Sequence, residues 1–574
     1  MLGVLLVFAA ALGVLLWHAS GEVPRADEWA TPGGYLVAHA EGTASFAHLF
    51  RQHNESRVIF SQLLAGLIAD HWGWNQHIFH GFNWLLAVLT AWLFVRLVSS
   101  SLGSDRRLGW PAVLVLCSAM ALVFSPVQWR NFLSSGQIIT IVIPCLLLAG
   151  ITINQKTSAP ALLRYALAAA FSLLASFSFV NGLLLWFLLW PAPFVMVQSG
   201  TVKVRRSELW ASLLYFAVAF AVVAAFFKGY GSPPGHPPIS YGLRMPHRTV
   251  FFALTWLAGP LSPEPMYYWQ GFSANWVPFA LCGGLAGVAG LLLVAWLLGN
   301  WRHWRPAVTS SPEHAHKLLV RIFPFLPALA YSVASAGAIA LARVGFGAVF
   351  GNTSRYSTVA VPAYLAMAGM LAVVTTRLDG LRAKRLLALF AATFALAVLA
   401  SGVVGCMQSA LDRSAARQAA VSLDFRDIAP NDPLLTNLYQ TSDLRLASRK
   451  ADDMERLGLL RRRSSLAWVK DQPVVSRKDL TYGIRLVDES WAYWLVTGTV
   501  SPTAGLEEDD LLILRDKTSA QPMAVIMAPA GRNYPGKPNG VFEVRYMKAL
   551  AGPLAVDSAD VLLVRPRSHE SWKL

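Results

Sequence analysis

Three stretches of this chain run for 17 or 18 residues without one charged side chain, and they constrain its fold more than any other feature. They are residues 110–126, 136–153 and 181–198. About 18 apolar residues are enough for a helix to cross the hydrocarbon core of a bilayer. Only 14% of the 574 residues are charged, whereas soluble domains carry about 25%. The chain is therefore predicted to be a polytopic α-helical membrane protein.

The same pattern recurs along residues 1–405 and predicts about eleven spans in a multi-span membrane domain. No Lys or Arg precedes Arg25, so the first span is interpreted as an uncleaved anchor, with a cleaved signal peptide as the alternative. The predicted spans are 1–19, 76–98, 110–126, 136–153, 161–178, 181–198, 208–227, 275–299, 322–342, 356–376 and 386–405.

The positive charge of the chain lies almost entirely in the membrane half. Residues 1–405 have a net charge of +14 and residues 406–574 one of +2. This favours a topology signal and contact with anionic lipid over a nucleic-acid partner. Alternate connections between spans carry 16 and nine basic residues, which predicts that the richer set is cytoplasmic and that residues 406–574 lie outside. The short segment 248–262 is then predicted to be re-entrant or interfacial, because a further crossing would reverse every later loop.

The sequence changes character after the last span. Residues 406–484 are predicted to form a mixed, helical connector, and residues 485–574 a small β-rich domain. Within 541–546, Phe542, Val544 and Tyr546 alternate with Glu543 and Arg545, which is the period of a half-buried strand.

The first outer loop, residues 20–75, carries the candidate chemistry. Asp27 and Glu28 follow the first span directly. A carboxylate at the membrane surface can act as a general base toward an acceptor hydroxyl, although a solvated loop explains the pair equally well. The loop continues with His53-Asn54-Glu55-Ser56-Arg57 and an apolar stretch, 58–69, that is too short to span and is predicted to lie at the interface.

Three arginines in separate outer loops are the candidates for binding a phosphate: Arg57, Arg343 and Arg355. Guanidinium pairs with phosphate through two parallel hydrogen bonds and stabilises the charge of a phosphate leaving group. Ordinary lipid-headgroup binding is the alternative for each of them.

These motifs together resemble the GT-C superfamily of integral-membrane glycosyltransferases, which includes protein mannosyltransferases, lipid A aminoarabinose transferases and mycobacterial arabinofuranosyltransferases. The likeness covers residues 1–405 and is closest to an uncharacterised bacterial branch. It rests on Asp27-Glu28, on His53 to Arg57, and on segments 125–137, 178–182 and 343–356, which contain Gln128, Asn131, Gln137 and Tyr356.

The resemblance implies a polyprenyl-phosphate-sugar donor, an acceptor glycan, lipid or protein of the cell envelope, and transfer at the outer face of the bacterial inner membrane. It makes Asp27 the catalytic base, Glu28 its neighbour or substitute, and Arg57, Arg343 and Arg355 the donor-phosphate contacts. It also implies that seven residues bind substrate: His53, Asn54, Glu55, Gln128, Asn131, Gln137 and Tyr356.

One departure from the family concerns metal. Several members carry a second acidic residue in the next outer loop, where this chain reads Gln128-Trp129-Arg130-Asn131. The sequence therefore requires no cofactor, and a divalent metal is unsupported. Two other functions remain open: a transporter or flippase for lipid-linked saccharides, and a non-catalytic envelope scaffold whose C-terminal part recruits partners. The sugar, the acceptor and the lipid length are not encoded in any motif.

Overall fold

The computed structural model describes most of the chain. It covers residues 2–262 and 312–424, with short gaps at 21–22, 25, 104–107, 202–204, 234–235 and 377–380, and then residue 432, residues 444–460 and strands between 475 and 573. The described chain divides into two compact units. Unit 1 comprises residues 1–19, 45–63 and 79–409, and unit 2 comprises residues 20–44, 64–78 and 410–574.

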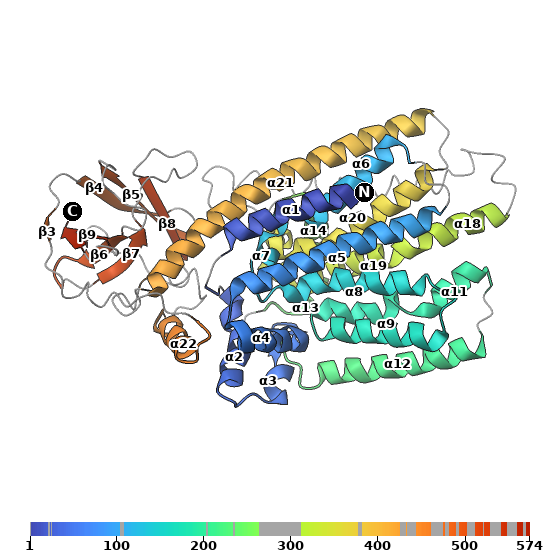
Figure 1. Ribbon diagram of the computed structural model, residues 1–574, viewed down its shortest axis with the longest axis horizontal. Coiled ribbons are helices and arrows are strands. Elements are labelled where there is room, and N and C mark those ends of the chain that lie inside the picture. Colours follow the sequence, from blue (N-terminus) through green and yellow to red (C-terminus); the bar gives the residue numbers. More distant parts are fainter. Residues whose placement is uncertain are drawn as a thin grey trace. The chain divides into compact units, whose positions relative to one another are not determined.

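Unit 1 is a bundle of apolar helices (Figure 1). Its longer helices are α1 (Leu2–Ala19), α5 (Gln76–Leu102), α6 (Trp110–Val123), α8 (Ile138–Asn154), α9 (Ala161–Ser176), α12 (Arg206–Phe227), α14 (Pro246–Ala258), α18 (Pro312–Ile322), α19 (Leu326–Arg343), α20 (Ser354–Thr375) and α21 (Leu381–Asp424). Shorter helices α7 (Trp129–Phe132), α10 (Leu185–Leu188), α11 (Pro191–Ser199) and α13 (Ile239–Arg244) connect them.

Eight helical segments among the described residues are long and apolar enough to cross a membrane, so the chain has the make-up of a polytopic helical membrane protein. Each matches a predicted span. Two further predicted spans correspond to the shorter apolar helices α8 and α9, and the predicted span 275–299 lies outside the described residues. The segment 248–262 overlaps α14, whose 13 residues fall short of a spanning helix.

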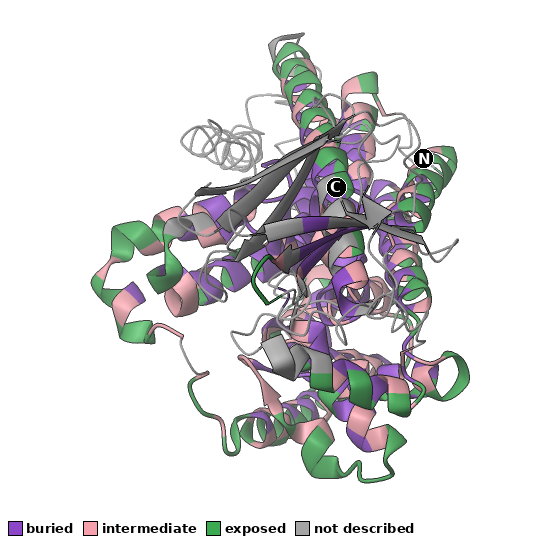
Figure 2. Ribbon diagram, turned by 90° about the vertical axis from the view of Figure 1, so that its left-hand side faces the viewer, coloured by how far each residue is buried: buried purple, intermediate pink, exposed green. Residues whose placement is uncertain are grey.

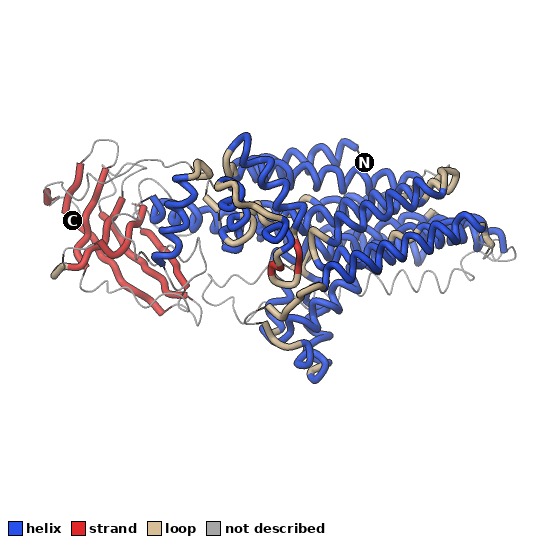
Figure 3. Tube along the Cα trace, turned by 90° about the horizontal axis from the view of Figure 1, so that it is seen from below, coloured by secondary structure: helices blue, strands red, loops and turns tan. Residues whose placement is uncertain are grey.

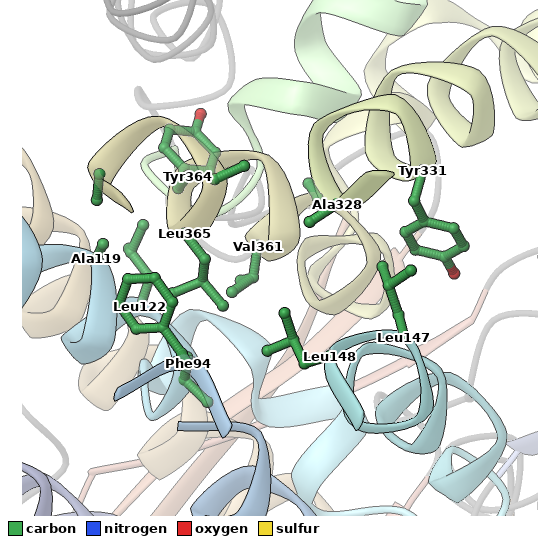
Figure 4. Packing of buried hydrophobic residues seen from close by; sticks show 14 of the residues in the cluster. Phe94, Ala119, Leu122, Leu147, Leu148, Ala328, Tyr331, Val361, Tyr364 and Leu365 are labelled. Atoms are coloured by element: carbon green, nitrogen blue, oxygen red, sulfur yellow. The ribbon is translucent and has the colours of Figure 1, made fainter. Parts of the chain in front are cut away.

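Helix α20 lies at the centre of the bundle. Within its 18 most apolar consecutive residues 94% are buried, whereas the same measure is 28% for α1 and α12. It packs against α6, α8 and α19, with Val361 and Leu365 directed toward Leu122 and Leu148 (Figure 4). Buried residues gather inside the bundle, and exposed apolar ones lie on its outer helices (Figure 2). An apolar exterior of this kind is suited to lipid.

A proline in the middle of α20 interrupts its hydrogen-bond ladder, because proline has no backbone N–H to donate. Ser332 of α19 inserts beside Pro362. Its hydroxyl donates to the Val359 carbonyl at 2.8 Å and accepts from the Ala363 N–H at 3.1 Å. The neighbouring helix thus supplies hydrogen bonds at the break, as is usual for prolines in membrane helices.

Unit 2 contains residues 20–44 and 64–78, from the connection after the first predicted span, and the C-terminal residues. Its loop elements are the 3₁₀ turn η1 (Ala26–Trp29), α2 (Gly33–Ala40) and the C-terminal part of α4 (Ile59–Trp72). Helix α4 covers residues 59–69 of the apolar stretch 58–69, whose position at the membrane interface stays a prediction. Helix α22 (Leu444–Arg456) packs here through Met454, which lies beside Gly33.

Among the described residues of unit 2, the strands lie beyond residue 474 (Figure 3). They form a five-stranded sheet in the order β3-β10-β9-β6-β7 and a three-stranded sheet in the order β4-β5-β8. Their bounds are β3 (Val475–Ser476), β4 (Thr481–Asp488), β5 (Tyr493–Ser501), β6 (Leu511–Asp516), β7 (Pro522–Met527), β8 (Val541–Met547), β9 (Ala559–Arg565) and β10 (Glu570–Lys573). The alternating segment 541–546 falls in β8, and strands begin about ten residues before the predicted boundary at 485.

Candidate functional site

The candidate site in unit 1 is built on a tight hairpin. Strands β1 (Gln52–His53) and β2 (Ser56–Arg57) pair in antiparallel fashion, and Asn54 and Glu55 form the turn between them. Asn54 has a φ of 48°, a left-handed conformation that asparagine tolerates better than most residues. The hairpin is held in place by Ser56, whose hydroxyl accepts the Val180 N–H at 3.1 Å. The turn thereby fixes the position of Glu55.

Glu55 forms a two-pronged ion pair with Arg343 at the end of α19. Arg343 Nε lies 3.0 Å from Glu55 Oε1, and Nη2 lies 2.5 Å from Oε2. The two side chains are 17% and 14% exposed. Burial alone would raise the pKa of Glu55, but the hydrogen bonds and positive charge of Arg343, with smaller contributions from the Glu55 backbone and His236, lower it below the ordinary value. Glu55 is therefore held as an anion.

Tyr356 connects this pair to a second arginine. Its hydroxyl accepts a hydrogen bond from Arg343 Nη1 at 2.6 Å. The guanidinium carbons of Arg343 and Arg355 lie 5.8 and 5.4 Å from the centre of its ring. The structure thus brings Glu55, Arg343, Arg355 and Tyr356 into one cluster, which we call the Glu55 cluster. Whether these residues bind a donor stays a prediction.

Arg57, the third predicted phosphate contact, is engaged by the protein itself. Its guanidinium donates to the carbonyls of Phe50, Phe226 (2.6 Å) and Lys228 (2.5 Å) and lies 4.2 Å from the centre of the Phe50 ring. The side chain is buried, and this burial lowers the pKa of Arg57. These contacts tie the hairpin to the loop after α12. A phosphate contact by the remaining N–H groups stays a prediction.

Gln128 and Asn131 are buried and fix the start of α20. Asn131 Nδ2 donates to the Arg355 carbonyl at 2.9 Å and to Thr358 Oγ1 at 2.6 Å. The Thr358 hydroxyl in turn donates to Gln128 Oε1 at 2.5 Å. These amides therefore support the turn that carries Arg355 and Tyr356. Their predicted contact with substrate is untested.

The remaining predicted substrate residues are half-buried. His53 and Asn54 lie in the hairpin, with Asn54 Nδ2 3.4 Å from His53 Nε2. Gln137 occupies the position directly before α8. Its backbone carbonyl accepts a hydrogen bond from the Thr140 hydroxyl at 2.9 Å. None of these contacts argues for or against a substrate role.

The predicted catalytic carboxylates belong to unit 2. Asp27 and Glu28 lie in the 3₁₀ turn η1, where the Asp27 carbonyl accepts the backbone N–H groups of Ala30 and Thr31. Asp27 is half-buried and Glu28 is buried. The turn packs through Trp29, whose ring lies edge-on to the Trp74 ring, with 6.3 Å between the two ring centres. Asp27, the predicted base, is thus the more accessible acid of the pair.

Sequence reasoning missed two members of this region, both in the loop after α12. His236 Nδ1 lies 3.0 Å from Glu55 Oε1, and the Tyr230 hydroxyl lies 3.5 Å from the Glu55 carbonyl oxygen. Burial and the Glu55 charge raise the pKa of Tyr230. The Pro- and Gly-rich stretch 229–238 indicates a loop, but no local pattern predicts what it contacts.

No group of three or more His, Cys, Asp or Glu side chains that could hold a metal ion occurs among the described residues. Comparisons with protein-family models, with curated proteins and with solved structures found no match.

Proposed function

We propose that this chain is a membrane glycosyltransferase that moves a sugar from a polyprenyl-phosphate donor to a glycan, lipid or protein acceptor of the bacterial cell envelope. The observation that carries the proposal is the Glu55 cluster. Two of its charged residues, Glu55 and Arg343, are 288 positions apart in the sequence, and the cluster lies where α19 ends and α20 begins. The sequence motifs that resemble the GT-C glycosyltransferases supply these same residues.

The charge and donor groups of the cluster suit the phosphate of such a donor. The guanidiniums of Arg343 and Arg355 both lie within 5.8 Å of the centre of the Tyr356 ring, and guanidinium groups pair with the negative charge of a phosphodiester. Arg343 uses three of its five N–H groups in the described hydrogen bonds to Glu55 and Tyr356. The remaining N–H groups are available to a phosphate oxygen. We assign Arg343 and Arg355 to the leaving phosphate, and Arg57 to the support of the hairpin as well.

The proposed reaction is a displacement with inversion. The oxygen of an acceptor hydroxyl forms a bond to the anomeric carbon while the bond from that carbon to the phosphate oxygen breaks. The electron pair of the broken bond stays on the phosphate, whose charge the guanidiniums stabilise. The hydroxyl proton passes to the carboxylate of Asp27, with Glu28 as its neighbour or substitute. No step requires a cofactor.

Transfer is proposed to occur on the outer face of the membrane, with residues 406–574 in the same compartment. The support is the distribution of 16 basic residues on one set of connections and nine on the other. The role of the C-terminal sheets is either to grip the acceptor or to cover the site.

The test is a transfer assay with the full chain in lipid nanodiscs. A panel of radiolabelled polyprenyl-phosphate sugars is incubated with the protein and with extracted envelope acceptors. We expect at least one donor to give a labelled product whose anomeric configuration is inverted. A flippase would move the intact donor across a vesicle membrane without product, and a scaffold would do neither. Either result would rule out the proposed glycosyltransferase activity in favour of that alternative function.

A further inference from the structure

The first outer loop and the C-terminal part of the chain meet at a buried glycine in unit 2. Gly33 is the first residue of α2. A β-carbon at this position would lie 2.8 Å from the Glu28 carbonyl oxygen, 3.0 Å from the Trp74 ring and 3.1 Å from the Met454 methyl group. Three segments that are distant in the sequence can converge here because glycine has no side chain. We call Gly33, Trp74 and Met454 the Gly33 junction.

The turn that carries the predicted catalytic carboxylates packs on this junction. Asp27 and Glu28 belong to the four-residue turn η1, which ends at Trp29. The Trp29 ring lies edge-on to the Trp74 ring, and its Nε1 donates to the Pro24 carbonyl at 2.8 Å. Both tryptophans are buried. The backbone of Glu28 and the ring of Trp29 thus both rest against the junction, which therefore sets the position of the turn.

Helix α22 contributes Met454 and a backbone carbonyl to the junction. The helix ends in a Schellman motif, in which Gly458 has a φ of 71°. The Gly458 N–H bonds to the Glu455 carbonyl at 3.0 Å, and the Leu459 N–H bonds to the Met454 carbonyl at 2.8 Å. The reversed chain presents the Leu459 carbonyl to the Trp74 N–H, which donates to it at 3.0 Å. The end of α22 thus holds Trp74 by its backbone as well as by its ring.

Helix α4 ends in a matching way directly before Trp74. Gly73 has a φ of 64°, and its N–H bonds to the Ala69 carbonyl at 3.0 Å, which is the simpler left-handed helix cap. A β-carbon at Gly73 would lie 3.3 Å from the Gly458 carbonyl oxygen. The two glycine-capped helix ends therefore pack backbone to backbone, and Trp74 is held where they meet.

Resting on the proposed function, we infer that the residues of the Gly33 junction are positioning residues, which fix the turn η1 so that Asp27 can take the acceptor proton. Catalysis is sensitive to such placement, because a displacement of about 1 Å can cost about 10²-fold in rate. A turn of only four residues depends on its surroundings for that precision. Helix α22 is then a clamp on the proposed catalytic turn, a role that no sequence motif predicted.

The experiment measures sugar transfer by the full chain in nanodiscs for two junction variants. Gly33→Ala adds a β-carbon that displaces the Glu28 carbonyl, and Met454→Ala removes the methyl group beside Gly33. We expect kcat per folded molecule to fall roughly 10- to 100-fold for Gly33→Ala and roughly three- to tenfold for Met454→Ala. Binding of farnesyl methyl phosphate, a polyprenyl phosphodiester without a sugar, should be unchanged, because the proposed phosphate contacts belong to unit 1.

The deciding measurement repeats both substitutions in the Asp27→Asn background. A positioning residue acts through the base, so its loss should cost less than about twofold more once the base has been removed. A merely structural role would reduce the amount of folded protein in both backgrounds and leave kcat per folded molecule unchanged.

Two matched controls accompany the junction variants. Met120→Ala truncates a methionine that is equally buried but lies in α6 of unit 1. Arg456→Gln removes an exposed ion pair with Glu41, 3.2 Å long, that also joins α22 to the end of α2, and such surface pairs contribute little. Both controls should keep the kcat of the unmodified protein. The thermal midpoint identifies a junction variant that fails to fold, and Trp74→Phe then takes its place.

The outcomes separate this inference from the function on which it rests. If the junction variants keep the original kcat, or lose the same factor with and without Asp27, the positioning role is wrong while the proposed function stands. If the unmodified protein transfers no sugar from any donor, the proposed function fails together with the inference. A loss of kcat in the junction variants that disappears in the Asp27→Asn background would support both.

Discussion

Two Arg–Glu pairs among the described residues of unit 1 differ in their surroundings. Arg164 of α9 and Glu208 of α12 meet with side chains only 2% and 5% exposed, and the adjoining contacts are made by hydroxyl groups, with Tyr165 Oη 2.7 Å from Ser212 Oγ. Arg343 and Glu55 are 14% and 17% exposed and have a histidine, a tyrosine and a second arginine around them. The first pair is closed off from solvent, whereas the second is partly accessible and adjoins further polar and charged side chains.

This difference indicates which pair can serve a ligand. A buried pair that compensates itself costs desolvation and stabilises the fold chiefly because loss of one partner is worse. A half-buried pair with a second guanidinium nearby can exchange part of its contacts for a phosphate. We therefore assign a structural role to Arg164 and Glu208 and a binding role to the Glu55 cluster. The predictions below test this division.

The largest stability effect is expected from Glu208→Gln, which leaves the buried guanidinium of Arg164 without a charged partner. Removal of one member of a buried pair typically costs about 3–5 kcal/mol. The thermal midpoint in nanodiscs should fall by several degrees, while transfer per folded molecule stays within about twofold of the original value. A protein of unchanged midpoint that no longer transfers sugar would mean that this pair also serves the substrate.

An intermediate effect is expected from Glu55→Gln, and it should depend on pH. The carboxylate has a lowered pKa in the folded protein, so its stabilisation is present above its unfolded pKa of about 4.3 and is lost as the pH falls through the lower folded value. At neutral pH the loss of its charge-assisted hydrogen bonds should cost about 1–3 kcal/mol. Thermal midpoints of both proteins, measured from about pH 7 downward, should converge below about pH 4. A constant difference would show that Glu55 is not stabilised as an anion.

The smallest effect is expected from Glu313→Gln at the start of α18. Glu313 pairs with Lys317 one turn later, and both side chains are more than half exposed. Such i,i+4 pairs contribute about 0.3–0.5 kcal/mol. The midpoint should stay within experimental error and transfer should be unchanged. A large loss here would show that removal of any acidic residue harms this protein, and the contrast between the two Arg–Glu pairs would then lose its meaning.

The sequence predicted the helices well because each apolar run is a local signal. Every predicted span within the described residues contains an apolar helix. The residues of the Glu55 cluster were also named, since short motifs carry Glu55, Arg343 and Tyr356. Their mutual contacts were not predictable from spacing, because they join segments 288 residues apart.

Two features could not be predicted from the sequence. Arg164 lies near the start of the predicted span 161–178, but nothing in that span indicates its buried pair with Glu208 of α12. His236 lies in a loop whose composition indicates turns and nothing more. Both depend on the way distant helices and loops pack, and neither the hydropathy of the chain nor the spacing of its residues indicates that packing.

The most direct test of the account compares sugar transfer by Asp27→Asn and Glu28→Gln. Asparagine keeps the size of aspartate and cannot take a proton, and general-base catalysis typically contributes about 10²–10⁴-fold. With a labelled polyprenyl-phosphate sugar and purified protein in nanodiscs, Asp27→Asn should bind farnesyl methyl phosphate normally yet lose transfer by that factor. Glu28→Gln should retain part of its activity. Near-normal turnover by Asp27→Asn would contradict the proposed mechanism, and equal losses in both variants would remove Asp27 as the specific base.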